Sequence, residues 1–268
     1  MKFQFLVSTM DKNVDNIIRM TKRNNTYGSA LVINQTIDDL EFFESKNIKV
    51  YSYNERGLSK SRNRAIENSN ADVCLICDDD IIYHKDIDKK ILESFETNPD
   101  YDLIAFYVDR SKDFHHKELG ISHKVNFFQS MGLMSVQIAF KRNSIIENNL
   151  KFDEDFGAGS TKYICGEENI FLTDCLRKGL KILYVPIEIA KLTETDSTWF
   201  TGYNELYFKS KGAVFYRMSK IMYLPLIILF AFLKKRMYSK DATMFQAIKY
   251  MNCGYKEYKE KIHENKIY

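Results

Sequence analysis

The chain has 268 residues, of which 45% are hydrophobic and 28% are charged. This composition supports a packed core and excludes a disordered chain, while only three prolines and eleven glycines exclude a linker-rich or fibrous protein. The formal net charge of +3 does not indicate a nucleic-acid partner, which requires a concentrated basic stripe.

The first half of the sequence alternates between strand and helix patterns. Continuous apolar runs, typical of strands buried on both faces, predict strands at Phe3–Val7, Ala30–Ile33, Ile48–Tyr53, Val73–Cys77 and Leu103–Val108. One helix is expected to be capped by Ser59 or Ser61 and to reach Asn68, and another to end at Asn98-Pro99. This alternation predicts an α/β fold with a mostly parallel sheet and helices on both faces.

Further elements follow in the second half. We expect a strand at Ser135–Phe140, a helix at Glu167–Lys178 with Gly179 as its C-cap, and a strand at Leu180–Val185 stopped by Pro186. From about residue 205 the pattern is helical throughout. The predicted organisation is therefore an α/β domain at 1–205 and a helical, basic extension at 206–268.

The five cysteines are an odd number, and no secretory signal precedes the first expected strand. A reducing cytoplasm is therefore the expected setting. Cys74 and Cys77 have the spacing of a redox or metal-binding pair, but both fall in an expected strand. Residues three apart on a strand point to opposite faces, so we interpret the pair as core residues.

Three consecutive carboxylates, Asp78, Asp79 and Asp80, directly follow an expected buried strand. Ligands of open α/β sheets bind beyond the carboxyl ends of the strands. Carboxylate oxygens suit Mg²⁺ or Mn²⁺, and Mg²⁺ is typically held by one or two carboxylates together with substrate phosphates. The triplet therefore predicts a metal that bridges a nucleotide diphosphate; a solvated acidic turn is the alternative interpretation.

A basic segment, Gly57 to Ala65, precedes this strand. Arg62 and Asn63 within it are candidates to face a nucleotide base or phosphate, to which an arginine can give forked hydrogen bonds. A solvated basic face of a helix is the alternative.

In combination these segments resemble the family 2 glycosyltransferases, which have a GT-A fold. Three later segments extend the resemblance to roughly residues 3 to 200, in the order typical of the family: Phe152 to Gly157, Gly166 to Phe171 and Lys181 to Pro186. The resemblance implies a nucleotide-sugar donor, Mg²⁺ or Mn²⁺ as cofactor, and transfer with inversion.

The resemblance also implies roles for individual residues. Ser8 and Thr9 end the first strand, where the base is approached, and Arg62 and Asn63 lie near the nucleobase. Asp78 lies near the ribose or the metal and Asp80 binds the metal, while Asp79 can exchange roles with either neighbour. Glu168 stands where the family usually has its catalytic Asp, and would remove the acceptor proton.

Three features depart from the family pattern. Asn34 ends the second strand, at a position where the family often has an Asp that contacts the base. Asn34 is expected to bind the base in its place, but this change leaves the nucleobase preference open. Glu168 is one methylene longer than the usual Asp. As an alternative to catalysis, Glu168 can be an acidic residue of the first helical turn that the helix dipole favours. No histidine closely follows Val185-Pro186 to act as a further metal or phosphate ligand, and the role of Glu194 to Trp199, which occupies that region, is open.

Other titratable residues provide alternatives. If Glu168 is not the base, the next candidates are Asp153, Asp155 and Asp196. His115, His116 and His123 match no zinc-site spacing and are expected in a loop over the site.

Ile221 to Leu233 is an uncharged run of thirteen residues. It is shorter than the roughly 20 apolar residues that cross a bilayer, and Lys220 and Lys234-Lys235-Arg236 flank it. These features predict a helix in the interface of an anionic membrane, with a buried core helix as the alternative.

The combined prediction is a bacterial surface-polysaccharide glycosyltransferase, peripheral on the inner face of the cell membrane. It is expected to move a sugar from a UDP-linked donor to a lipid-linked saccharide. A sugar-nucleotide-forming nucleotidyltransferase would need a glycine-rich loop after the first strand, and Ser8 to Lys12 is not one. A non-catalytic nucleotide-binding module on the membrane is disfavoured by the acidic triplet and Glu168.

Overall fold

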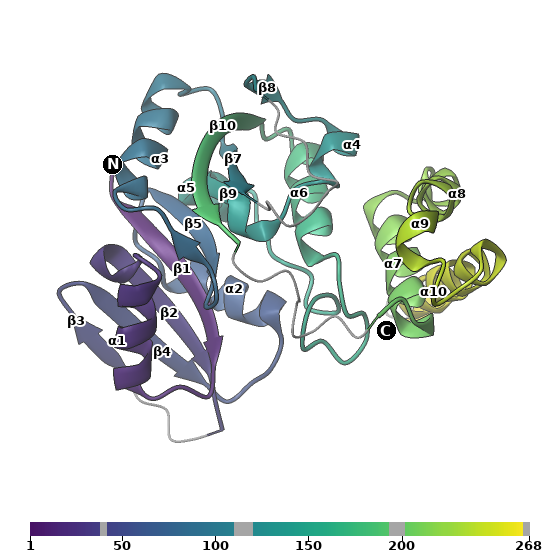
Figure 1. Ribbon diagram of the computed structural model, residues 1–268, viewed down its shortest axis with the longest axis horizontal. Coiled ribbons are helices and arrows are strands. Elements are labelled where there is room, and N and C mark those ends of the chain that lie inside the picture. The colour runs from purple at the N-terminus through teal and green to yellow at the C-terminus, as the bar shows by residue number, and fades with distance from the viewer. Residues whose placement is uncertain (38–41, 110–119, 193–201, 265–268) are drawn as a thin grey trace. The chain divides into compact units, whose positions relative to one another are not determined.

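The computed structural model describes residues 1–37, 42–109, 120–192 and 202–264. The chain forms two compact units (Figure 1). Unit 1 comprises 1–56, 60–152 and 172–195, and unit 2 comprises 57–59, 153–171 and 196–268. The division at residue 205 stays a prediction, since these units follow spatial packing rather than chain order.

Unit 1 contains a sheet of ten strands among the described residues, in the order β3-β4-β2-β1-β5-β9-β7-β10-β6, with β8 beside β10. Strands β4, β2, β1 and β5 are parallel, as are β7 and β10, whereas β9 runs antiparallel to both β5 and β7. The α/β prediction is confirmed, with more antiparallel pairing than expected. The strands are β1 Phe3–Met10, β2 Ala30–Gln35, β3 Phe43–Ser45, β4 Ile48–Tyr53, β5 Val73–Asp78, β6 Ile82–Tyr83, β7 Leu103–Asp109, β8 His123–Lys124, β9 Ile138–Lys141 and β10 Ile182–Lys191.

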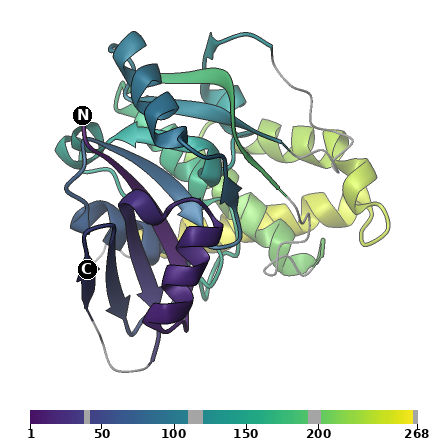
Figure 2. The ribbon, with the colours of Figure 1, turned by 60° about the vertical axis from the view of Figure 1, so that its left-hand side comes forward.

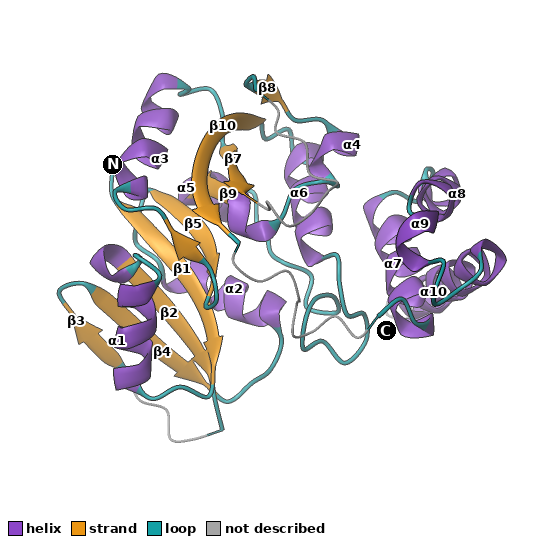
Figure 3. Ribbon diagram, viewed as in Figure 1, coloured by secondary structure: helices purple, strands orange, loops and turns teal. Residues whose placement is uncertain are grey.

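Helices flank this sheet (Figure 3). Helices α1 and α3 cover one face, where Ile17 and Ile87 join a core with Phe5 and Val7 of β1. Figure 2 shows α1 in front of the sheet and α2 behind it. The helices up to residue 177 are α1 Val14–Arg23, α2 Leu58–Asn68, α3 Ile87–Thr97, α4 Phe127–Ser130, α5 Arg142–Glu147 and α6 Glu167–Arg177, with short 3₁₀ turns η1 Tyr27–Ser29 and η2 Ser135–Gln137.

The two cysteines of the CxxC pair lie in β5 and are fully buried as free thiols. Cys77 belongs to the core beneath α1 and α3, whereas the Cys74 sulfur lies 3.3 Å from the Ser69 hydroxyl. The interpretation of the pair as core residues is confirmed.

Three predicted boundaries were wrong. Ser59 and Ser61 lie inside α2 and bond to distant partners, so neither caps the helix. The expected strand at Ser135–Phe140 begins as the turn η2. Strand β10 continues past Pro186, because the pairing register shifts after Val185 and a proline is tolerated at such a bulge.

Unit 2 ends in helices, as predicted: α7 Glu205–Met218, α8 Tyr223–Leu233, α9 Lys235–Tyr238 and α10 Met244–Glu264. Helix α7 begins where the Asn204 side chain accepts a hydrogen bond from the Tyr207 backbone N–H. Helices α7 and α10 meet at Gly212 and Gly254. A Cβ on Gly212 would lie 1.8 Å from the Met251 carbonyl oxygen, and one on Gly254 would lie 1.9 Å from that of Lys209. The described residues include no helix that is both long and apolar enough to cross a bilayer.

Candidate active site

The predicted donor-binding residues of unit 1 meet at one edge of its sheet. In the parallel strands β2, β1 and β5, Thr9 is aligned with Asn34, and Ser8 with Asp78. Asp79 and Asp80 follow β5 immediately. The register therefore brings polar side chains from three strands to the carboxyl end of the sheet, where ligands of α/β proteins bind.

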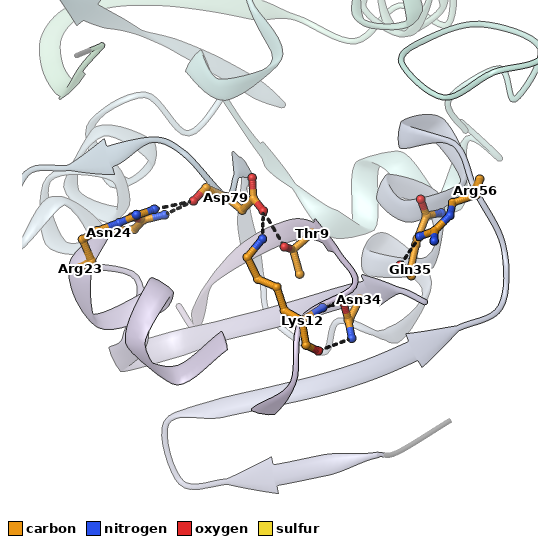
Figure 4. Close-up of polar contacts among 8 residues, drawn as sticks. All are labelled: Thr9, Lys12, Arg23, Asn24, Asn34, Gln35, Arg56 and Asp79. Atoms are coloured by element: carbon orange, nitrogen blue, oxygen red, sulfur yellow. Dashed lines mark hydrogen bonds and ion pairs between the residues drawn. The ribbon is translucent and has the colours of Figure 1, made fainter. Parts of the chain in front are cut away.

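Asp79 is held by four residues (Figure 4). Its Oδ2 accepts hydrogen bonds from the Thr9 hydroxyl at 2.5 Å and from the Lys12 ammonium at 2.8 Å. Its carbonyl oxygen accepts from the Arg23 guanidinium at 3.0 Å and from the Asn24 amide at 2.8 Å. Both the carboxylate and the backbone of Asp79 are thus fixed between β1 and α1.

Asn34 is buried and bonds to the backbone of Lys12 in both directions. Its Oδ1 accepts from the Lys12 N–H at 3.2 Å, and its Nδ2 donates to the Lys12 carbonyl at 2.8 Å. This reciprocal pair fixes the loop after β1 and so orients Lys12 toward Asp79. Base recognition by Asn34 stays a prediction.

Arg62 lies beneath the first carboxylate of the triplet, with a side chain only 3% exposed. Its Nη2 is 3.3 Å from Asp78 Oδ1 and donates to the Ser135 hydroxyl at 2.8 Å. Its guanidinium also lies over the Phe152 ring, 5.4 Å from the centroid. A charge so deeply buried requires a counter-charge, and Asp78 provides it.

The neighbours of Arg62 bond to other parts of unit 1. The Ser61 hydroxyl donates to that of Ser8 at 2.8 Å, so Ser8 is joined to α2. Asn63 donates to the Phe152 carbonyl at 2.9 Å and accepts from the Phe152 N–H at 2.8 Å. These bonds give Ser8 and Asn63 positioning roles; their contacts with a nucleotide stay predictions.

Asp80 is the member of the triplet that reaches the surface most. The pKa of its carboxyl is raised by partial burial and by the charges of Asp78 and Asp79. A divalent cation would relieve this repulsion, and carboxylate oxygens are the ligands that Mg²⁺ and Mn²⁺ prefer. No group of three or more His, Cys, Asp or Glu side chains arranged to hold a metal is found in the described residues. Because Mg²⁺ is commonly held by one or two carboxylates plus phosphates, Asp80 with Asp78 still fits such an ion.

Glu168, in the first turn of α6, belongs to unit 2 and is half-buried. It interacts electrostatically with Lys211 of α7. Burial lowers the pKa of Lys211, but the acidic groups around it, Cys165, Tyr207, Glu168 and Glu167, raise that pKa above its usual value. Lys211 therefore remains charged, and a cation beside a carboxylate favours the ionised state that a general base needs.

The neighbouring Glu167 is buried and packs against the loop at Gly157. A Cβ on Gly157, which has φ of +106°, would lie 3.1 Å from Glu167 Oε2. Position 157 therefore favours glycine for both its backbone conformation and its closeness to this carboxylate. Of the two glutamates, Glu167 fits a structural role and Glu168 is the more accessible.

The alternative bases in unit 2 are ion-paired. Asp153 Oδ2 lies 2.8 Å from the Arg217 guanidinium. Asp155 binds Lys162, at 2.7 Å, and Lys261. Burial raises the pKa of Asp155, but the hydrogen bonds from the two lysines outweigh it and lower that pKa. Asp153 and Asp155 are therefore both held in ion pairs within unit 2.

Some sequence predictions lie outside the described residues: Asp196, His115 and His116, and the whole segment from Glu194 to Trp199. His123 is described, and its Nδ1 lies 3.3 Å from the Ile121 carbonyl oxygen. Conversely, Lys12, Arg23 and Asn24 were not predicted from the sequence as site residues. Lys12 could have been found only from its positive charge and its position shortly after the first strand, which was expected to lie beside the strand that precedes the acidic triplet.

Comparison with known proteins gives a family and a fold. A profile described as Glycosyl transferase family 2 matches residues 24–164, more than half of the chain. That span includes Asn34, Arg62 and the acidic triplet, and it ends four residues before Glu168. No curated protein matches the sequence.

Solved structures with the same fold include TarS from S. aureus. Its 1–349 fragment in complex with UDP-GlcNAc has a TM-score of 0.63 at 13% identity, with 99% of this chain and 92% of that chain covered. A longer TarS chain has a TM-score of 0.56 at 14% identity; the match covers 80% of this chain but only 39% of that one. The mannosyltransferase PcManGT from Pyrobaculum calidifontis, with GDP-Man and Mn²⁺, has a TM-score of 0.53 at 11% identity and covers 94% and 73%. These likenesses confirm the GT-A-type fold.

Proposed function

Because the chain belongs to glycosyl transferase family 2, we propose that it transfers a sugar, with inversion, from a UDP-linked donor to a lipid-linked saccharide. The observation that carries this proposal is the polar cluster at the carboxyl ends of β1, β2 and β5 within the family span. The UDP donor is supported by the TarS complex with UDP-GlcNAc. The lipid-linked acceptor, in surface-polysaccharide assembly on the inner face of the membrane, is supported by the exposed apolar side chains of α8.

At the donor, Lys12 and Arg62 supply positive charge beside Asp79 and Asp78. Thr9 and Asn34 hold the loop after β1 in the conformation that carries Lys12. Asp80, with Asp78, would hold Mg²⁺ or Mn²⁺. When bound, such an ion supplies neutralising charge for the diphosphate leaving group.

At the acceptor, Glu168 takes the proton of the attacking hydroxyl. The hydroxyl oxygen forms a bond to the anomeric carbon, and the bond from that carbon to the diphosphate oxygen breaks with its electron pair on the nucleoside diphosphate. A single displacement of this kind inverts the anomeric centre. Lys211 places a positive charge beside Glu168.

The donor half of the proposal is tested by nucleotide-sugar binding. UDP-sugars should bind and be slowly hydrolysed with Mn²⁺ in the absence of acceptor. Asp80→Asn should abolish the Mn²⁺-dependent part of binding without lowering the melting temperature, because Asp80 lies at the surface. Asp100→Asn, an exposed carboxylate elsewhere in unit 1, is the matched control and should bind normally. Unchanged affinity of Asp80→Asn in Mn²⁺ would exclude the triplet as the metal site.

The base is tested separately by turnover. Glu168→Gln should lower the rate by about 10²–10⁴-fold, the usual contribution of a positioned general base. Its donor affinity should not change, since the donor residues lie on other strands and helices. Glu96→Gln, an exposed glutamate of α3, is the control for the same chemical change. If Glu168→Gln retains full turnover, another group accepts the proton.

A further inference from the structure

Helix α8 presents an exposed apolar face. Ten of the eighteen large hydrophobic side chains that are exposed among the described residues lie between 221 and 245. Six of them form what we call the apolar face: Ile221, Leu224, Ile228, Leu229, Phe232 and Leu233. Ile228, Phe232 and Leu233 are 60%, 70% and 63% exposed, which is unusual for contiguous large apolar residues of a soluble surface.

The opposite side of α8 is packed within unit 2. Leu226, Ile227 and Ala231 are almost completely buried, and the Ala231 carbonyl accepts a hydrogen bond from the Tyr238 hydroxyl. At 100° per residue these three lie within one arc of the helix, and Ile228 and Phe232 lie outside that arc. The helix is therefore apolar all round, but the described residues of the chain cover only one side of it.

Cations border the apolar face in sequence. Between residues 220 and 245 the chain has five basic residues, Lys220, Lys234, Lys235, Arg236 and Lys240, against one acidic residue, so the net charge is five minus one, or +4. All five basic residues are exposed, and within the described part of the chain none of them forms an ion pair. An uncovered apolar face flanked by unpaired cations complements a surface that is apolar inside and anionic outside.

We propose that the apolar face binds the surface of a bilayer that contains anionic lipids, with α8 lying in the plane of the interface. A helix of eleven residues is about 16 Å long at 1.5 Å per residue, whereas the hydrocarbon core is about 30 Å thick, so α8 lies on the bilayer rather than across it. The apolar side chains enter the boundary between headgroups and acyl chains, and the cations meet anionic headgroups. The proposal deepens the proposed lipid-linked acceptor, because it brings the enzyme to the surface where such an acceptor resides.

Sedimentation with vesicles tests the apolar contribution, without donor or acceptor. Wild-type protein should sediment with vesicles of phosphatidylcholine mixed with phosphatidylglycerol. Ile228→Glu/Phe232→Glu should reduce partitioning by at least about 10²-fold, since each buried apolar side chain contributes about tenfold or more. Ile146→Glu/Phe128→Glu makes the same chemical changes at exposed sites of unit 1 and should sediment like wild type.

The ionic contribution is tested by charge removal. Replacing Lys234, Lys235 and Arg236 with alanine should weaken binding on the order of 10²-fold at low salt, from about fivefold per basic residue near an anionic surface. Wild-type protein should bind phosphatidylcholine alone more weakly, and added salt should weaken its binding to mixed vesicles.

Three outcomes would overturn the proposal. The first is that wild-type protein remains in the supernatant with mixed vesicles. The second is that the Ile228→Glu/Phe232→Glu variant sediments to the same extent as wild type. Alternatively, light scattering shows a wild-type dimer that this double substitution dissociates while vesicles bind neither form, in which case a second copy covers the face. A folded, inactive enzyme that still binds vesicles would contradict the proposed function and leave this proposal standing.

Discussion

Gly212→Ala tests whether α7 and α10 pack as closely as the structure indicates. Gly212 lies inside α7 with ordinary helical backbone, so alanine would by itself favour the helix by about 1 kcal/mol. The added Cβ, however, would lie 1.8 Å from the Met251 carbonyl oxygen, and real Cβ atoms essentially never approach within 3.0 Å. The two helices would have to separate by at least 1.2 Å, the difference between these distances.

The expected net effect is destabilisation by about 2 kcal/mol. Overpacking of a well-packed contact costs about 1–3 kcal/mol, and the upper end applies because the opposing atom belongs to a helix backbone and cannot rotate away. Subtracting the helix-propensity gain of about 1 kcal/mol leaves about 2 kcal/mol. The melting temperature should fall by about 4–8 °C, from about 2–4 °C per kcal/mol for chains of this size.

Urea unfolding followed by circular dichroism measures the change in free energy, and amide hydrogen exchange shows whether α7 and α10 lose protection first. Gly28→Ala is the control, because a Cβ there meets no atom within 4 Å, and its free energy of unfolding should change by less than about 0.5 kcal/mol. If Gly212→Ala raises the free energy of unfolding, the gain in helix propensity exceeds the cost of overpacking, and the two helices are not in contact at this residue.

Two further predictions concern lysines beside the proposed site. Lys12→Met should lower nucleotide-sugar affinity, measured by calorimetry, about tenfold, because a charged hydrogen bond is lost. It should hardly change stability, because both side chains of the Lys12–Asp79 pair are about one-third exposed. Equal weakening by the exposed-site control Lys46→Met would contradict the prediction. Lys211→Met should move the acidic limb of the pH–rate profile to higher pH, since removing the cation disfavours ionised Glu168, and an unmoved limb would show that Lys211 does not act on Glu168.

Apolar runs predicted the fold well, because strands buried on both faces carry their own signal. All five strands expected in the first half are present, with ends that differ by up to three residues. Pro186 was misinterpreted as a strand end because a proline removes a ladder hydrogen bond. In β10 a register shift next to this proline accommodates it, and such a shift depends on the partner strand rather than on local sequence.

The site was predictable as a location but not as a network of contacts. The ends of β1, β2 and β5 could be expected to meet, because parallel strands share an edge. The bond from Asn34 to the Lys12 backbone depends on the conformation of a loop. The bond between Asn63 and the Phe152 backbone depends on a contact across 89 residues. Local sequence carries no signal for such contacts, and contacts of these two amides with a nucleotide stay predictions.

The network also bears on the ambiguity within the acidic triplet. Sequence alone allowed Asp79 to exchange roles with either neighbour. In the structure Asp78 has the Arg62 guanidinium at 3.3 Å and Asp79 has the Lys12 ammonium at 2.8 Å, so each of these carboxylates already faces a cation. The pKa of the Asp80 carboxyl is raised by partial burial and by the charges of Asp78 and Asp79. A divalent ion gains most where negative charge is least compensated, which favours Asp80 as its principal ligand. Asp79, joined to β1 through Thr9 and Lys12, would then keep the loop in place rather than bind the ion, so Asp79→Asn should loosen donor binding with and without Mn²⁺, whereas Asp80→Asn should act only in its presence.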